Sequence, residues 1–241
     1  MFRAEGHGKE LHFENAGVIG GNEVFRDKET GSRWQQSSLE AFSGPMKGEH
    51  LKLRAFLLTN WGEWQKLHPD TLVLKPLPGY AERIPEVNKR VQEGLLQRGN
   101  APDGVLRTDT RLPPKTMILG LDVEGANKAF PLNALRQTRV VNDTLGQTPI
   151  LIVHQPGSVT TTAFSARLNG NILKFTVANP EATELIDVQT QSRWDPYGHC
   201  VAGKFKGSNL QSLIIEPEYW FAWSEFHPDT AIFAPAPSGA R

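Results

Sequence analysis

The sequence predicts an α+β fold rich in β-structure, made of two tandem, pseudo-symmetric copies of mostly antiparallel strands. Short apolar runs that alternate with polar residues and end at Gly, Pro or Asn predict many strands. Few segments have helical periodicity, and a set of rare residues recurs in the second half of the chain in the same register. Because strands outnumber helices, the class is β-rich α+β.

The composition excludes several classes of protein. With 241 residues, of which 39% are hydrophobic and 22% charged, the chain is long enough to bury a core. Its 26 Lys and Arg balance 26 Asp and Glu, so no global field attracts nucleic acid. No apolar run approaches the roughly 18 to 20 residues that a membrane helix needs, so we expect no transmembrane segment in this chain. Ligand, protein partner, oligomeric state and compartment stay open.

Two repeated segments carry the internal repeat. Asp27 to Trp34 returns as Asp187 to Trp194, and Trp61 to Thr71 returns as Trp220 to Thr230. So many rare residues in one register indicate two copies of one unit. We therefore expect a first copy, a connector, a second copy and a tail, at residues 1–78, 79–115, 116–236 and 237–241.

The two copies differ at their beginnings. The second copy opens with a strand-rich stretch, residues 117–164, that has no counterpart before Met1. If both copies once began alike, the first copy lacks its opening strands. We therefore expect Met1 to lie inside a repeat, opposite Ala163 of the second copy.

Strands are expected wherever an apolar run lies between turn residues such as Gly20-Gly21-Asn22 and Asn169-Gly170-Asn171. In chain order, the expected strands are residues 11–13, 24–26, 51–58, 72–74, 117–123, 140–142, 150–154, 160–167, 172–178, 185–188, 213–215 and 231–233.

Helices are expected at three places and at the repeat of one of them in the second copy. The connector favours one over about residues 85–98, with Pro at its first position, apolar residues four apart and Gly99 as C-terminal cap. A shorter helix is predicted at 61–67, with Asn60 as N-cap and Pro69 ending it. A single turn of helix is expected at 131–136.

The repeated helix Trp-x-x-Trp-x-x-x-His places its three named residues on one face. One hypothesis is a ligand-binding or metal-binding wall. The other is a structural helix that packs its indoles into the core of each half and ends at Pro-Asp-Thr. The residues concerned are Trp61, Trp64 and His68 in the first copy and Trp220, Trp223 and His227 in the second.

The repeated Asp-x-x-Thr-x-Ser-x-Trp segment also has two interpretations. Asp27 and Ser32, with Asp187 and Ser192, offer a carboxylate and a hydroxyl that could bind a polar ligand. The same residues are typical of a tight turn in which Asp and Ser bond nearby backbone N–H groups, and this interpretation is favoured. Cys200 follows His199, but neighbours in a strand point to opposite faces, which argues against a thiolate–imidazole pair.

Several long motifs carry a family resemblance. They are residues 26–36, 44–48, 61–71, 111–115, 129–132, 141–143 and 220–230. Over nearly the whole chain they resemble a bacterial and archaeal family known only as domain of unknown function 3179. The resemblance implies no established activity.

The chain departs from that family's pattern at one place. The resemblance implies that full-length relatives carry a strand ending in a Tyr-Cys-Pro-x-Cys-like segment just before the point that corresponds to Met1. The matching place in the second copy is Val153-His154-Gln155-Pro156. Cysteine-based chemistry is therefore not expected in this chain. The resemblance also implies exported or lipid-anchored relatives, whose localisation signal would lie before Met1.

Two functional hypotheses follow. The first is a non-catalytic module that binds a small molecule or a protein partner in a cleft between the halves, without an assigned catalytic residue. The alternative is a metal-dependent or redox enzyme with a transition metal held by His68 and His227, and with His154, Asp27 or Asp187 as further ligands. Convergence of His and carboxylate side chains in one concave pocket would favour the enzyme.

Overall fold

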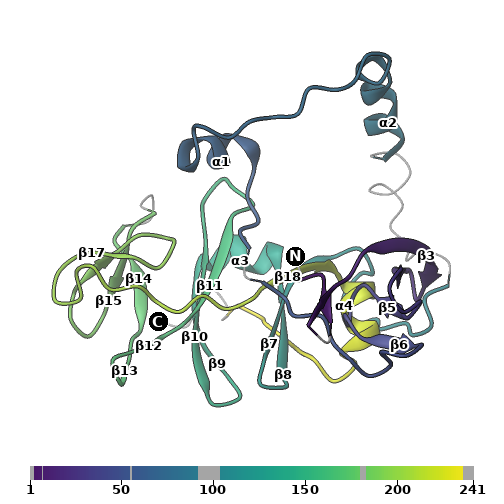
Figure 1. Cartoon of the computed structure of the whole chain (residues 1–241). Helices are drawn as coiled ribbons and strands as arrows, with labels where there is room; N and C mark the ends of the chain where they lie inside the picture. The colour runs from purple at the N-terminus through teal and green to yellow at the C-terminus, as the bar shows by residue number, and fades with distance from the viewer. Residues whose placement is uncertain (1–2, 7, 55, 92–103, 180–182, 236–241) are drawn as a thin grey trace.

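The computed structural model describes residues 3–6, 8–54, 56–91, 104–179 and 183–235, and its fold is β-rich α+β, as predicted (Figure 1). In chain order the elements are β1 (Glu5–Gly6), β2 (Lys9–Glu10), β3 (Phe13–Ile19), β4 (Asn22–Asp27), β5 (Arg33–Gln35), β6 (Ala41–Ser43), α1 (Trp61–Leu67), the 3-10 helix η1 (Ala81–Arg83), α2 (Ile84–Val91), β7 (Met117–Val123), β8 (Ala126–Pro131), α3 (Leu132–Thr138), β9 (Val140–Leu145), β10 (Thr148–His154), β11 (Thr161–Ser165), β12 (Arg167–Leu168), β13 (Asn171–Ile172), β14 (Phe175–Val177), β15 (Leu185–Asp187), β16 (Arg193–Trp194), β17 (Cys200–Ala202), β18 (Glu216–Tyr219), α4 (Trp220–Phe226) and β19 (Ala231–Ile232). No helix in these described parts is long and apolar enough to cross a bilayer.

Two four-stranded antiparallel sheets have the same construction. One has the order β3-β4-β5-β6 and the other β14-β15-β16-β17. Each has a register shift at an Arg-Trp pair, Arg33/Trp34 in the first sheet and Arg193/Trp194 in the second. Both indoles are buried, and each meets a Phe edge to face, Phe13 in the first sheet and Phe175 in the second. In each sheet the tryptophan therefore anchors the local core.

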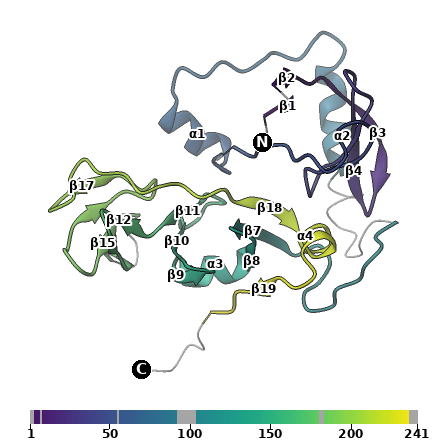
Figure 2. The same ribbon diagram turned by 60° about the horizontal axis from the view of Figure 1, so that its bottom comes forward.

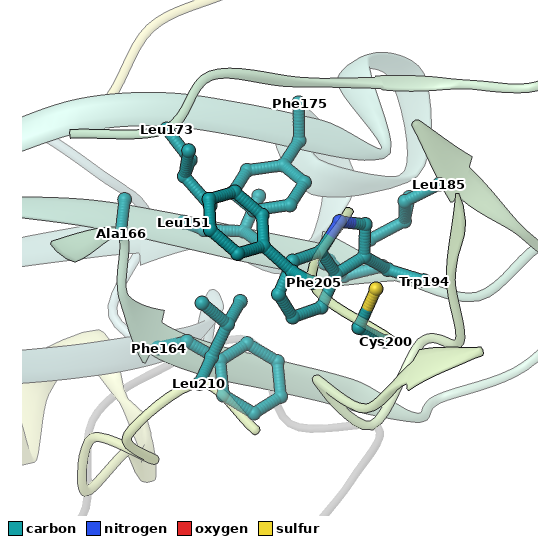
Figure 3. Close-up of a cluster of buried hydrophobic side chains, with 11 residues drawn as sticks. Leu151, Phe164, Ala166, Leu173, Phe175, Leu185, Trp194, Cys200, Phe205 and Leu210 are labelled. Carbon is teal, nitrogen blue, oxygen red and sulfur yellow. The ribbon is translucent and has the colours of Figure 1, made fainter. Parts of the chain in front are cut away.

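The core of the later sheet extends into the preceding hairpin (Figure 3). Trp194 packs there with Leu151 and Phe164, which come from β10 and β11. Phe205 and Cys200 belong to the same buried cluster. Because this cluster joins β10 and β11 to β14–β17, the second half of the chain has a continuous core around these elements.

A third sheet, of order β18-β7-β8-β19, carries helix α4 (Figure 2). Strand β7 pairs antiparallel with β8 and β18, while β19 runs parallel to β8. Trp220 and Trp223 of α4 are fully buried with Ile118 and Ala129 of this sheet. The β3–β6 sheet lies next to α4 in Figure 1, so the two halves of the chain meet around this helix.

Helix prediction was accurate where a cap marks the helix. Helix α1 spans residues 61–67 as predicted, and Asn60 Oδ1 accepts the backbone N–H of Glu63 at 3.0 Å. Helix α3 covers the predicted turn of helix. In the connector, α2 is described from Ile84 to Val91, and the rest of the expected helix lies outside the described residues.

Three expected strands were wrong, at residues 51–58, 72–74 and 213–215; in the last case the strand β18 begins only at Glu216. Residues 72–74 form no strand, and Leu72 and Leu74 are both 94% exposed, so no neighbouring strand or core covers them. Residues 51–54 and 56–58 form no regular strand, and Leu58 has an isolated bridge to Thr161. An apolar run becomes a strand only where a partner strand satisfies its backbone groups.

Candidate functional site

The two Asp-Thr-Ser-Trp turns contain the same hydrogen bonds. Asp27 Oδ1 accepts the N–H of Thr30 at 2.6 Å, and its Oδ2 accepts Trp34 Nε1 at 2.8 Å. Asp187 accepts the N–H of Thr190 at 2.6 Å and Trp194 Nε1 at 3.1 Å. These bonds give each carboxylate its partners within its own turn.

All four candidate residues of these turns are enclosed. Asp27, Ser32, Asp187 and Ser192 have no exposed surface. Burial alone would raise the pKa of Asp27, but hydrogen bonds from Trp34 and Thr30 outweigh it and lower that pKa. Their hydrogen bonds fit the structural interpretation of this motif.

The Trp-Trp-His helices also share their contacts. Trp223 Nε1 donates to Thr230 Oγ1 at 3.0 Å and its ring stacks on His227 with centroids 3.8 Å apart. In α1, Trp64 Nε1 donates to Thr71 Oγ1 at 2.9 Å, and the centroids of Trp64 and His68 are 4.1 Å apart.

The two helices differ in how far their residues are buried. Trp220 and Trp223 have no exposed surface, whereas Trp61 is 47% exposed and none of the seven residues of α1 is buried. The indoles of α4 therefore lie in the core, as the structural interpretation predicted. For α1 that interpretation was wrong, because none of its residues is buried and no sheet in the described parts of the chain covers it as β7 and β8 cover α4.

The three histidines expected as metal ligands have separate local partners. His154 is buried, with Nδ1 2.8 Å from Thr161 Oγ1, and His227 Nδ1 lies 3.2 Å from the carbonyl of Trp223. His68 is exposed, and its ring lies against that of Trp64 at a tilt of 40°. Over the described parts of the chain, no group of three His, Cys, Asp or Glu side chains is arranged to hold a metal ion.

A cavity of about 630 Å³ lies where the β3–β6 sheet meets the second half, and we call it the inter-sheet cavity. Leu39, Phe42 and Phe226 contribute to its apolar wall. The polar lining residues are Gln35, Ser37, Ser38, Glu40 and His50 from the first half, and Asp122, Glu216 and His227 from the second. Histidine and carboxylate side chains thus share one concave site, with His227 the one predicted residue among them.

The strand β18 brings two half-buried carboxyl groups, Glu216 and Glu218, to this boundary. Burial, followed by the nearby charge of Asp122, raises the pKa of Glu216 to about 7. Burial, and then Glu216, raises the pKa of Glu218 to about 8, against a hydrogen bond from Ser37. Ser37 Oγ lies 3.1 Å from both carboxylate oxygens of Glu218 and links the two halves of the chain. Both acids are therefore neutral over much of the pH range in which an exposed Glu is charged.

The same surroundings shift the pKa of His227. Burial lowers the pKa of its imidazole, while the hydrogen bond to the Trp223 carbonyl and the charge of Asp122 oppose this shift. The ring is thus held neutral at the rim of α4, beside the carboxyl groups that line the cavity.

Sequence reasoning missed Asp122, His50 and Glu216. The sequence Glu216-Pro217-Glu218 could have indicated this site. Residues two apart in a strand point to the same face, and two carboxyl groups on one face of a half-buried strand are unusual. Asp122 and His50 have no such signal, because each is placed by contacts between distant segments.

A family model described as "Protein of unknown function (DUF3179)" matches residues 1–230. The chain belongs to this family. Comparisons with curated proteins and with solved structures gave no match. The DUF3179 match spans every residue that lines the inter-sheet cavity, from Ile19 to His227. Because the description of the family names no activity, the function has to be argued from the cavity.

Proposed function

We propose that this protein is a non-catalytic binding module that takes a small organic molecule with a positively charged group into the inter-sheet cavity. Three side chains that can carry negative charge, Glu40, Asp122 and Glu216, line the cavity, and among its described lining residues there is neither Lys nor Arg. Its volume of about 630 Å³ lies within the range of small-molecule sites. The grouping of these carboxyls beside apolar walls is the observation that carries the proposal.

The proposal gives Glu216 a defined role. Its pKa of about 7 means that the carboxyl group is half protonated near neutral pH in the empty cavity. A bound ammonium or guanidinium group favours the carboxylate, since an opposite charge nearby stabilises the charged form. Binding therefore releases a proton, and affinity rises with pH through about 7.

The proposal also includes the tandem architecture. The first copy, residues 1–78, forms one wall of the cavity, and the second, residues 116–236, forms the other. The matching hydrogen bonds of Asp27 and Asp187 and the matching Trp–Thr bonds of α1 and α4 support two copies of one unit. In this arrangement Trp220 and Trp223 shape the second copy, and Trp61 and Trp64 remain accessible for a ligand or partner.

Binding of amines tests the proposal. Calorimetric titrations would use putrescine and choline as cationic probes, with 1,4-butanediol and succinate as neutral and anionic counterparts. We expect the cations alone to bind, and Glu216→Gln to weaken them roughly tenfold, as expected for loss of a charged hydrogen-bond partner. Glu10→Gln, at an exposed position in β2, is the matched control and should leave binding unchanged. Equal binding of the diol, or unchanged binding by Glu216→Gln, would contradict the proposal.

The convergence of His and carboxylate side chains in the inter-sheet cavity favours a second candidate, an acid–base enzyme. Glu216 has a pKa of about 7 and shares the cavity with His227, and such poised groups are frequent in active sites. Proton NMR of the bound amine separates the two functions. If the spectrum of the amine stays unchanged, the binding module is favoured. If the amine is slowly converted to a product, and Glu216→Gln abolishes this conversion, the enzyme is favoured.

A further inference from the structure

A second cavity, of about 510 Å³, lies at the end of α3, and we call it the α3 cavity. Arg136 from the last turn of the helix and Arg139 at its C-cap line it. His154, at the end of β10, and Asn60, just before α1, line it too. In Figure 1, α1 lies above the β10–β11 hairpin, with α3 beside it.

The lining of the α3 cavity is positively charged. Arg136 and Arg139 contribute two guanidinium groups, and none of the described lining residues is Asp or Glu. The neighbouring carboxylate of Glu63 is already held by hydroxyl groups of the protein. Its Oε2 accepts hydrogen bonds from Ser158 at 2.7 Å, from Thr59 at 3.0 Å and from Thr160. Among its described residues, the lining of the α3 cavity thus has two guanidinium groups and no carboxylate.

Two uncharged lining groups, Asn60 and His154, add further polar atoms to the cavity. Asn60 Oδ1 accepts the N–H of Glu63, which leaves the amide Nδ2 as a donor. His154 is 2% exposed, and its Nδ1 is 2.8 Å from Thr161 Oγ1, which leaves Nε2 for a ligand. A buried imidazole with one nitrogen fixed by a hydroxyl has a defined orientation.

The charges of the cavity act on this imidazole. Burial lowers the pKa of His154 first, and the charges of Arg136 and Arg139 lower it further, with Glu63 opposing them. An anion between the guanidinium groups would screen their effect and favour the imidazolium form. A rise in the pKa of the His154 imidazole would therefore indicate that an anion occupies the cavity.

Arginines near a helix C-terminus also interact favourably with the helix dipole. That role needs neither a cavity nor a buried imidazole beside the two cations. Planar guanidinium groups are suited to two-point recognition of carboxylate and phosphate oxygens.

We propose that the α3 cavity binds the phosphate or carboxylate group of a small molecule, held by Arg136 and Arg139 with Asn60 and His154 as further hydrogen-bonding partners. This site is separate from the inter-sheet cavity and has the opposite charge preference. It would allow the protein to bind an anionic ligand independently of the cationic one.

The first test follows His154 by NMR in the complete chain labelled at the imidazole nitrogens. The probes are inorganic phosphate, pyrophosphate and succinate, titrated at constant ionic strength. We expect at least one probe to raise the pKa of His154 in a saturable way. Saturation by the phosphates alone identifies a phosphate site, and saturation by succinate alone identifies a carboxylate site. If none of the three shifts the imidazole, the proposal is overturned.

Variants provide the second test. Arg136→Gln with Arg139→Gln should weaken the binding of the active probe at least tenfold, the approximate loss for a charged hydrogen bond. Arg136→Lys with Arg139→Lys should bind at an intermediate level, because charge remains without the planar fork. Arg167→Gln, exposed in β12, is the control. If the double Gln variant melts early, the single variant at exposed Arg136 replaces it, and unchanged affinity in that variant also overturns the proposal.

Discussion

The indole of Trp223 lies directly against the backbone of Gly120. A Cβ atom placed on Gly120 would lie 2.2 Å from Cζ3 of Trp223 and 2.4 Å from Cε3. The ring has no exposed surface, and it is fixed at its other end by the hydrogen bond to Thr230. The absence of a side chain at Gly120 is therefore what allows α4 to lie on β7.

Gly120→Ala should destabilise the protein. The added methyl group has to displace a fixed, buried ring, and such overpacking costs about 1–3 kcal/mol. Chemical denaturation would measure the change in the free energy of unfolding. Gly62→Ala is a control of opposite sign, because its Cβ would meet Asn60 Oδ1 at 3.5 Å and Ala in a helix gains roughly 0.5–1 kcal/mol over Gly. Equal effects of the two substitutions would argue against the close packing of α4 on β7.

Thr230→Val and Thr71→Val remove the same hydroxyl group from equivalent positions. Trp223 Nε1 and Thr230 are both buried, so Thr230→Val leaves a buried donor without its acceptor and should cost about 1–3 kcal/mol. Thr71 is exposed, and water can replace its hydroxyl, so Thr71→Val should have little effect. Unfolding in urea compares the two. A similar loss in both variants would show that α1 is buried in solution as α4 is.

The free energy of unfolding should decrease as the pH rises from mildly acidic to alkaline, because of Glu218. Burial and the charge of Glu216 raise its pKa in the folded protein to about 8, from 4.5 for an ordinary Glu. The folded state thus binds the proton more strongly, and this contribution is complete below about pH 4.5 and is lost as the pH rises through about 8.

Glu218→Gln removes that dependence, since the amide keeps an acceptor for Ser37 but does not ionise. Between pH 5 and pH 8.5, the wild-type protein should lose about 1–3 kcal/mol relative to the variant, an approximate fraction of the full linkage energy. Denaturation curves at both pH values provide the measurement, with Glu10→Gln as the control. If the free energy of unfolding changes with pH in the same way for the wild type and Glu218→Gln, Glu218 does not cause the pH dependence.

Cys200, the single cysteine of the sequence, should react slowly with disulfide reagents. It is 4% exposed, and burial raises the pKa of its thiol, so little thiolate is available to the reagent. His199 is paired with Asp195, at 2.7 Å, and does not activate the thiol. Ellman's reagent should label the native protein only at the rate of unfolding, whereas protein unfolded in guanidinium should react at once. Rapid labelling of native protein would contradict the burial of Cys200.

The sequence by itself determined the local structures. It was sufficient for the cap of α1 at Asn60, the bounds of β7 and the turns at Asp27 and Asp187, because these depend on contacts between residues near one another in the chain. It also predicted DUF3179 membership, which the family match confirms.

Only the tertiary structure decided what each local element contributes. Helices α1 and α4 share their motif, yet one is exposed and the other buried, because only α4 has β7 and β8 against it. The inter-sheet cavity likewise has lining residues from both halves of the chain, and Ser37 in its lining donates a hydrogen bond to Glu218, which lies 181 residues further along. Burial and nearby charge set the pKa values of Glu216 and Glu218, and neither burial nor such charge is a property of a short segment.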